Sequence, residues 1–171
     1  MADEIDRSAC LSDNGLHRYR LSRRWATSGD LMAFIMLNPS TADGTADDPT
    51  IRRCMSFARR EEWTGIEVLN LFAYRATNPA ELVEAAGAGI DPEGSDNWLH
   101  WHEVLENHRI AYVVAAWGAS SVVRRLRPSR ALSRWDRSGW FCLGTTADGS
   151  PRHPLYVRGD QPLEKMETTD G

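Results

Sequence analysis

Several ingredients of common functional classes are missing from this 171-residue chain. No apolar run approaches the ~20 residues needed to span a bilayer, and the acidic, polar start is not typical of a secretory signal. The three cysteines, Cys10, Cys54 and Cys142, lack the CxxC spacing of zinc and iron–sulfur sites and do not suggest a disulfide framework. We therefore expect a cytoplasmic protein without a membrane attachment.

Positive charge is also scarce. The net charge is −4 with a pI near 5.7, which argues against a protein that coats nucleic acid by bulk electrostatics. Lys165 is the only lysine among the 20 Lys and Arg residues. Because arginine is the better residue for forked contacts to phosphate, a role for single arginines in a binding site stays open.

Familiar site motifs are absent too: the chain has no GxGxxG fingerprint, no Walker-type lysine loop and no GxSxG elbow. What it does have is a series of apolar runs, near 31–37, 66–72, 110–117 and 140–143, separated by segments with helical spacing. This alternation predicts an α/β fold. Its expected form is a three-layer α/β/α sandwich with a central, mostly parallel sheet.

The chain divides into a body and two ends. We expect a disordered lead-in over 1–15, a single α/β domain over 16–158 and an acidic disordered tail over 159–171. Residues 17–25 alternate bulky and charged side chains, which predicts an antiparallel strand at the sheet edge with its arginines facing water. A turn would join this strand to the run at 31–37 as a hairpin.

The stretch from Phe34 to Arg53 attracts most attention, because a buried strand ends abruptly in a polar loop and a helix then opens at Asp48. In α/β folds the loops after the strand ends converge at one edge of the sheet, where ligands bind. We take Asn38 and His153 as candidate catalytic residues. Candidate binding residues in these loops are Pro39, Ser40, Thr41, Asp43, Asn70, Tyr74, Arg75, Trp117, Gly118 and Arg152.

Each candidate has a simpler reading beside it. Asn38 fits an Asx-type turn as well as a residue that orients water or reads a base edge. Trp117 and Tyr74 fit the core as well as stacking on a flat ligand. Asp43, Asp47 and Asp48 have oxygen ligands for a divalent cation, but they lack calcium-loop spacing and Asp48 fits a helix cap. No cofactor is predicted, and a divalent cation stays an alternative.

Four strings, MLNPSTADGTADDPTIRRC, VLNLFAYRATNP, VVAAWG and CLGTTADGSPRHPLYV, resemble a bacterial and phage family known as domain of unknown function 1643, over roughly Arg18 to Val157. The order of these motifs is also similar to that of the uracil-DNA glycosylase superfamily, whose sheet has four parallel strands. That resemblance implies that Asn38 positions water and that Asn70 pairs with a pyrimidine edge. It also implies that His153 donates a hydrogen bond to the departing base. His153 lies in a His-Pro string that lacks the Ser-Pro of the superfamily's motif.

Three functions follow as hypotheses. The first is recognition of a nucleobase or nucleotide with hydrolysis of its N-glycosidic bond. The second is a binding module for a nucleotide or nucleic acid that performs no chemistry. The third is a magnesium-dependent nucleotide hydrolase that uses the acidic loop 43–48. The expected partner is therefore a nucleobase, nucleotide or nucleic acid, and the sequence specifies no oligomeric state.

Overall fold

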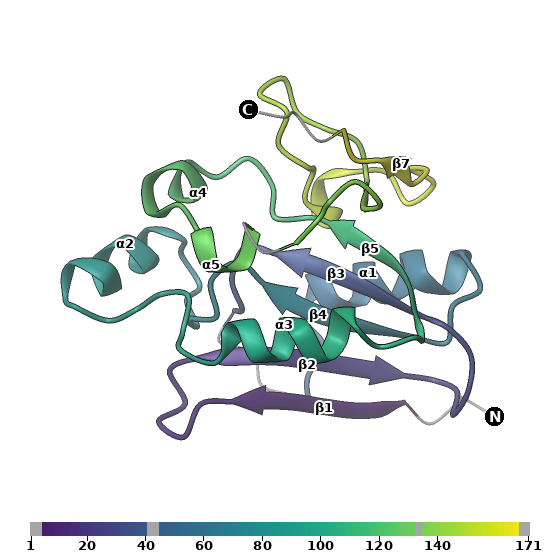
Figure 1. The fold of residues 1–171 in the computed structure, drawn as a ribbon. Helices are drawn as coiled ribbons and strands as arrows, with labels where there is room; N and C mark the ends of the chain where they lie inside the picture. The colour runs from purple at the N-terminus through teal and green to yellow at the C-terminus, as the bar shows by residue number, and fades with distance from the viewer. Residues whose placement is uncertain (1–4, 41–44, 133–134, 168–171) are drawn as a thin grey trace.

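The structure, a computed structural model, describes residues 5–40, 45–132 and 135–167. In this part of the chain seven strands form one sheet in the order β1-β2-β4-β3-β5-β6-β7 (Figure 1). The strands are β1 (Asp6–Leu11), β2 (Arg18–Arg24), β3 (Leu31–Met36), β4 (Gly65–Asn70), β5 (Ile110–Ala115), β6 (Phe141–Cys142) and β7 (Glu164–Lys165). The helices are α1 (Pro49–Arg60), α2 (Ala80–Gly87), α3 (Asn97–Leu105), α4 (Ser121–Leu126), α5 (Ser129–Leu132) and the 3-10 turn η1 (Pro154–Tyr156).

The sheet is mixed. Strands β4, β3, β5 and β6 run parallel and form its centre. The β1–β2 pair joins β4 antiparallel on one side, and β7 joins β6 antiparallel on the other. The predicted α/β class and the antiparallel N-terminal strand are confirmed, and the sheet as a whole is mixed, because segments at both ends of the chain extend its parallel centre with antiparallel strands.

Helices cover both faces of this sheet. Successive strand residues point to opposite faces, so Phe34 and Val68 belong to one apolar cluster while Ile35 and Leu69 belong to the other. The first cluster includes residues of α1, and the second includes residues of α2, α3 and α4. Figure 1 shows α3 in front of the sheet and α1 behind it. All six residues of β3 are buried, which explains its uninterrupted apolar sequence.

Helix α1 begins where the sequence predicts. The Asp48 side chain accepts a hydrogen bond from the Ile51 backbone N–H at 2.8 Å, and Pro49 occupies the first turn, where its missing N–H has no consequence. Arg59 and Arg60 in the last turn complement the helix dipole. This cap fixes the start of α1 next to the end of the preceding loop.

The N-terminal expectations need correction. The region predicted as a disordered lead-in contains β1, which forms the sheet edge. Strand β2 pairs with β1 and β4, so the predicted hairpin between 17–25 and 31–37 does not form. Strand β3 instead pairs with β4 and β5 on its two sides, since its residues are apolar throughout and are buried at the centre of the sheet.

Two arginines of β2 do not face water as predicted. Arg18 is 3% exposed and Arg23 is 0% exposed. The Arg23 guanidinium donates to the Asp47 carboxylate at 2.7 Å, so an ion pair compensates for its burial. On the opposite face of the sheet, the Glu67 carboxylate forms ion pairs with the guanidinium groups of Arg20 and Arg24, each at an N–O distance of 2.9 Å. The arginine-rich strand is thus an internal strand held by long-range ion pairs.

The C-terminal segment is partly ordered. Glu164–Lys165 pairs with Phe141–Cys142, and the Met166 N–H donates to the Trp140 carbonyl at 2.8 Å. The predicted disorder of 159–171 is therefore wrong for these residues, while 168–171 lie outside the described part. Within the described ranges, no helix has both the length and the apolar character needed to cross a membrane.

Candidate functional site

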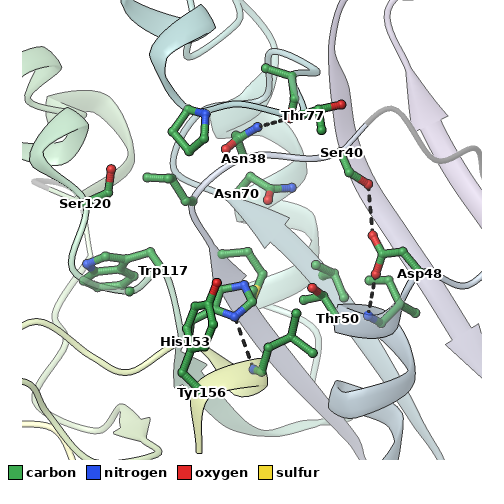
Figure 2. A pocket seen from close by; sticks show the side chains of 18 of the residues that line it. Asn38, Ser40, Asp48, Thr50, Asn70, Thr77, Trp117, Ser120, His153 and Tyr156 are labelled. Atoms are coloured by element: carbon green, nitrogen blue, oxygen red, sulfur yellow. Dashed lines mark hydrogen bonds between the residues drawn. The ribbon is translucent and has the colours of Figure 1, made fainter.

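A cavity of about 550 Å³ opens at the carboxyl ends of the parallel strands. Its walls come from the segments that follow β3, β4 and β5, from the start of α1 and from the loop that leads into η1. Segments far apart in the chain meet here because parallel strands place their carboxyl ends at one sheet edge. Asn38, Asn70 and His153 all line this cavity (Figure 2).

Asn38 follows the end of β3 and is fixed by its own loop. Its side-chain NH₂ donates to the carbonyl of Pro39 at 3.0 Å and to that of Ala76 at 2.8 Å. Two carbonyl acceptors on one side settle which end of the amide is the NH₂ group. The amide oxygen is therefore the end that these two hydrogen bonds do not engage. Asn38 thus ties its loop together through its NH₂ group and also lines the cavity, and its role toward water or a base stays a prediction.

Asn70, the last residue of β4, differs from Asn38. It is 1% exposed, yet both polar atoms of its side chain lack a hydrogen-bond partner. Its main-chain carbonyl accepts hydrogen bonds from the side chains of Asn97 and Trp101 at 3.0 and 3.1 Å. A buried amide without partners destabilises a fold by about 1–3 kcal/mol. Asn70 lines the cavity, and both polar atoms of its amide are buried there.

His153 stands at the start of η1 as a neutral donor. Its Nδ1 accepts the Leu155 backbone N–H at 3.2 Å, which places the ring proton on Nε2. Burial lowers the pKa of His153 below its ordinary value of 6.5, although the nearby Asp48 carboxylate acts in the opposite direction. At neutral pH the ring therefore carries one N–H, and Nε2 is the nitrogen not engaged by Leu155.

The acidic residues before α1 have structural partners. Asp48 accepts from the Ser40 hydroxyl at 2.9 Å in addition to capping α1 (Figure 2). Asp47 accepts from Arg23 and from Arg7, whose hydrogen bonds hold the pKa of this carboxyl below its usual value against the raising effect of burial. Asp43 lies outside the described residues. Among those described, no three His, Cys, Asp or Glu side chains are grouped as a metal site.

The remaining predicted residues divide into two groups. Ser40, Trp117, Gly118 and Arg152 line the cavity with the three residues above. Pro39, Tyr74 and Arg75 do not line it, and Thr41 lies outside the described residues. The Tyr74 ring packs edge-on against His17, and Arg75 donates to the Gly15 carbonyl at 3.0 Å, because the chain after β4 turns toward the start of β2.

The backbone conformation explains why a glycine occupies position 118. Its φ is +75°, a region that L side chains rarely adopt, and a Cβ there would lie 3.4 Å from the Cβ of His153. Its N–H donates to the Pro151 carbonyl at 2.9 Å. The glycine thus lets the segment after β5 approach the loop that carries His153.

Several cavity residues were not predicted. Three of them, Thr50, Ser120 and Tyr156, are close in sequence to predicted residues, and Figure 2 shows them on the same walls of the cavity. Tyr156 is 80% exposed, and its ring lies 5.5 Å from that of His153. Arg18 comes from β2, at the other end of the chain. The position of Tyr156 just past the His-Pro string was a usable signal, whereas nothing local in the sequence marks Arg18 as a cavity residue.

The fold and this cavity define an α/β protein with a polar cavity at the carboxyl edge of its parallel strands. The chain belongs to the family described as Protein of unknown function (DUF1643), which matches residues 18–155. That match spans β2 to η1 and so includes every described strand that contributes to the cavity. No curated protein and no solved structure matches the chain in the same comparisons.

Proposed function

We propose that the cavity binds a nucleobase and that the protein hydrolyses the N-glycosidic bond of the bound nucleoside unit. The observation that carries this proposal is the buried Asn70 amide, whose donor and acceptor both lack partners on the cavity wall. A carboxamide presents an adjacent acceptor and donor, which matches the edge of a pyrimidine that offers an N–H beside a carbonyl. Met36, Val68 and Trp117 supply apolar surface for the faces of a flat ring.

The hydrolysis requires two further groups, one that orients a water and one that donates to the departing base. The Asn38 oxygen accepts a hydrogen bond from a water and orients it toward the sugar carbon. That water gives its hydroxyl to the carbon while the carbon–nitrogen bond breaks and its electron pair leaves with the base; the remaining water proton ends on the base nitrogen. The Nε2–H of His153 donates to the base oxygen, where negative charge develops.

The resemblance to uracil-DNA glycosylases is part of this proposal. The similarity to uracil-DNA glycosylases implies a four-stranded parallel sheet, and β4, β3, β5 and β6 are parallel here. It also implies an asparagine after the first strand, an asparagine at the end of the second and a loop histidine; Asn38, Asn70 and His153 hold these places around one cavity. This agreement in position supports the proposed chemistry and the predicted layered sandwich.

A base-release assay tests the proposal. Uracil and a panel of damaged and modified bases are presented as nucleosides, as nucleotides and within single- and double-stranded DNA, and free base is measured by chromatography. We expect release of at least one base by the wild-type protein and by Arg125→Gln, which changes an exposed residue of α4. We expect none from His153→Ala. Equal release by His153→Ala and the wild type would remove the assigned role of this histidine.

One observation favours a binding module as the second candidate. Both oxygens of Asp48, the carboxylate on the cavity wall, are already used by Ser40 and Ile51, and an amide such as Asn38 is too weak a base to deprotonate water. A module of this kind would bind the base through Asn70 without turnover. Saturable binding in calorimetry combined with no release in the assay above would select it.

A further inference from the structure

Arg18 and Arg20 lie on opposite faces of the sheet although they are two residues apart. In the pairing of β2 with β1, Cys10 is opposite Arg20 while Leu11 is opposite Arg18, so Tyr19 is an extra residue that forms a bulge. Side chains at i and i+2 share a face in a regular strand, and a bulge breaks that rule. Arg20 binds Glu67 on the α3 face, whereas Arg18 lines the cavity together with the start of α1.

The bulge thus directs a guanidinium into the candidate site. Arg18 is 3% exposed, and its backbone N–H donates to the Ala73 carbonyl at 2.8 Å, which fixes this end of β2 against the segment after β4. Burial lowers the pKa of Arg18 to about 10; the Asp48 carboxylate opposes the shift, and Arg75 and Arg23 add to it. The group still carries its charge at neutral pH, in a place where neighbouring arginines add positive potential.

We infer that Arg18 binds the phosphate of a free nucleoside 5′-monophosphate whose base contacts Asn70. The inference rests on the proposed function and narrows its substrate class. A guanidinium forms forked, charge-assisted hydrogen bonds with phosphate oxygens. The cavity of about 550 Å³ lies within the range of roughly 300–1,000 Å³ typical of small-molecule sites.

A free nucleotide fits this site better than a polynucleotide for two reasons. Arg18 is almost fully buried, so a phosphate that reaches it has to enter the cavity, and a terminal monoester does so more easily than a phosphodiester with chain on both sides. The net charge of −4 also opposes binding of a long polyanion. The amide of Asn70 and the guanidinium of Arg18 would then hold the two ends of one small ligand.

Calorimetric titration tests this substrate class. The probes are uridine, thymidine, cytidine, adenosine, guanosine and inosine, their 5′-monophosphates, inorganic phosphate and single-stranded oligonucleotides with the same bases. For the base that binds, we expect the monophosphate to bind about 10- to 100-fold more tightly than its nucleoside, the range of one charge-assisted contact. Inorganic phosphate should compete with the monophosphate and not with the nucleoside.

Variants assign the effect to this residue. Arg18→Met keeps much of the side-chain volume and should bring monophosphate affinity down to that of the nucleoside, while nucleoside affinity stays unchanged. Arg125→Gln, on the surface of α4, should leave both affinities unchanged. If Arg18→Met does not fold, the comparison of nucleoside with monophosphate in the wild-type protein still decides whether the cavity holds a phosphate site.

The outcomes separate the two proposals. Equal wild-type affinity for nucleoside and monophosphate overturns the phosphate site and leaves the base site standing. Tighter binding of an oligonucleotide than of the monophosphate overturns the free-nucleotide assignment. If none of the base-containing probes binds, the proposed function itself is overturned.

Discussion

Asn38 and Asn70 line the same cavity but use their amides in opposite ways. The NH₂ group of Asn38 is held by two loop carbonyls, whereas both polar atoms of the buried Asn70 side chain lack partners. Each difference follows from the residue's position, since Asn38 lies in the segment after β3 and Asn70 ends the central strand β4. The first amide is oriented by the protein, and the second is the one that we propose contacts a ligand.

This difference predicts an unusual response to mutation at Asn70. Asn70→Leu removes an amide without partners, so the free energy of unfolding should stay the same or rise by up to about 2 kcal/mol, while ligand binding is lost. Asn97 is the matched control, because it is equally buried and its side chain donates to the Asn70 carbonyl at 3.0 Å. Asn97→Leu should lower stability by about 1–3 kcal/mol.

Urea denaturation of both variants checks this prediction. A loss of more than 1 kcal/mol in Asn70→Leu, together with retained ligand binding, would show that the Asn70 amide has a structural role instead.

Asn38 should be more costly to remove than His153. Asn38→Ala removes two hydrogen bonds and leaves the Ala76 carbonyl without its side-chain donor, so we expect a loss of about 1–2 kcal/mol in the free energy of unfolding together with loss of base release. His153→Ala loses one hydrogen bond from Leu155 and should stay within about 1 kcal/mol of the wild type. Chemical denaturation measures both, and the opposite order of stabilities would contradict the assigned contacts.

His153 should be neutral at pH 6.5 with its proton on Nε2. Burial lowers its pKa below 6.5, and the Leu155 N–H occupies Nδ1. Long-range ¹H–¹⁵N spectra of the imidazole ring, recorded from pH 5 to 8, report both the tautomer and the pKa. A ring that is mostly protonated at pH 6.5, or that carries its proton on Nδ1, would rule out the proposed donor.

Glu67 anchors the internal arginine strand. Burial raises the pKa of its carboxyl, but hydrogen bonds from Arg20 and Ser22 and the Arg20 charge outweigh that effect, and the pKa lies below its usual 4.5. Glu67→Gln should therefore lower stability by about 3 kcal/mol at pH 7, because Arg20 and Arg24 lose their countercharge.

The effect at Glu67 should depend on pH with a definite sign. A carboxyl whose pKa is lowered by folding stabilises the protein above about 4.5, and that contribution is lost as the pH falls through the folded-state pKa. The difference between Glu67→Gln and the wild type should thus shrink below that pH in urea titrations. Glu103→Gln, whose side chain is 60% exposed, should differ from the wild type by less than about 0.5 kcal/mol. A pH-independent difference at Glu67 would contradict the ion-pair account.

The central strands and the start of α1 were predictable because their signals are local. The run at 31–37 is apolar without a break, and Asp48-Pro49 combines a capping side chain with a residue suited to the first helical turn. Strand β1 escaped prediction since DRSACL is mostly exposed at the sheet edge and carries little apolar alternation. Its pairing depends on β2 rather than on its own sequence.

The site was predictable only where it follows strand ends. Asn38, Asn70 and His153 meet because the carboxyl ends of parallel strands share one edge, and the apolar runs revealed those ends. Tyr74 and Arg75 are in such a loop too, but contacts with His17 and Gly15 draw them away. Arg18 escaped prediction because a bulge reverses its face, and an irregularity of one residue leaves no mark in an alternating sequence.

The most direct test of the central claim follows the side-chain NH₂ resonances of Asn70 in ¹⁵N-labelled protein, assigned through Asn70→Leu, during titration with nucleobases, nucleosides and their monophosphates. The account predicts that at least one of these ligands shifts the Asn70 pair in a saturable manner and that the Asn97 pair, which already donates to a carbonyl, moves far less. If every ligand leaves the Asn70 resonances unchanged at millimolar concentration, the cavity does not read a base through this amide and the account is wrong.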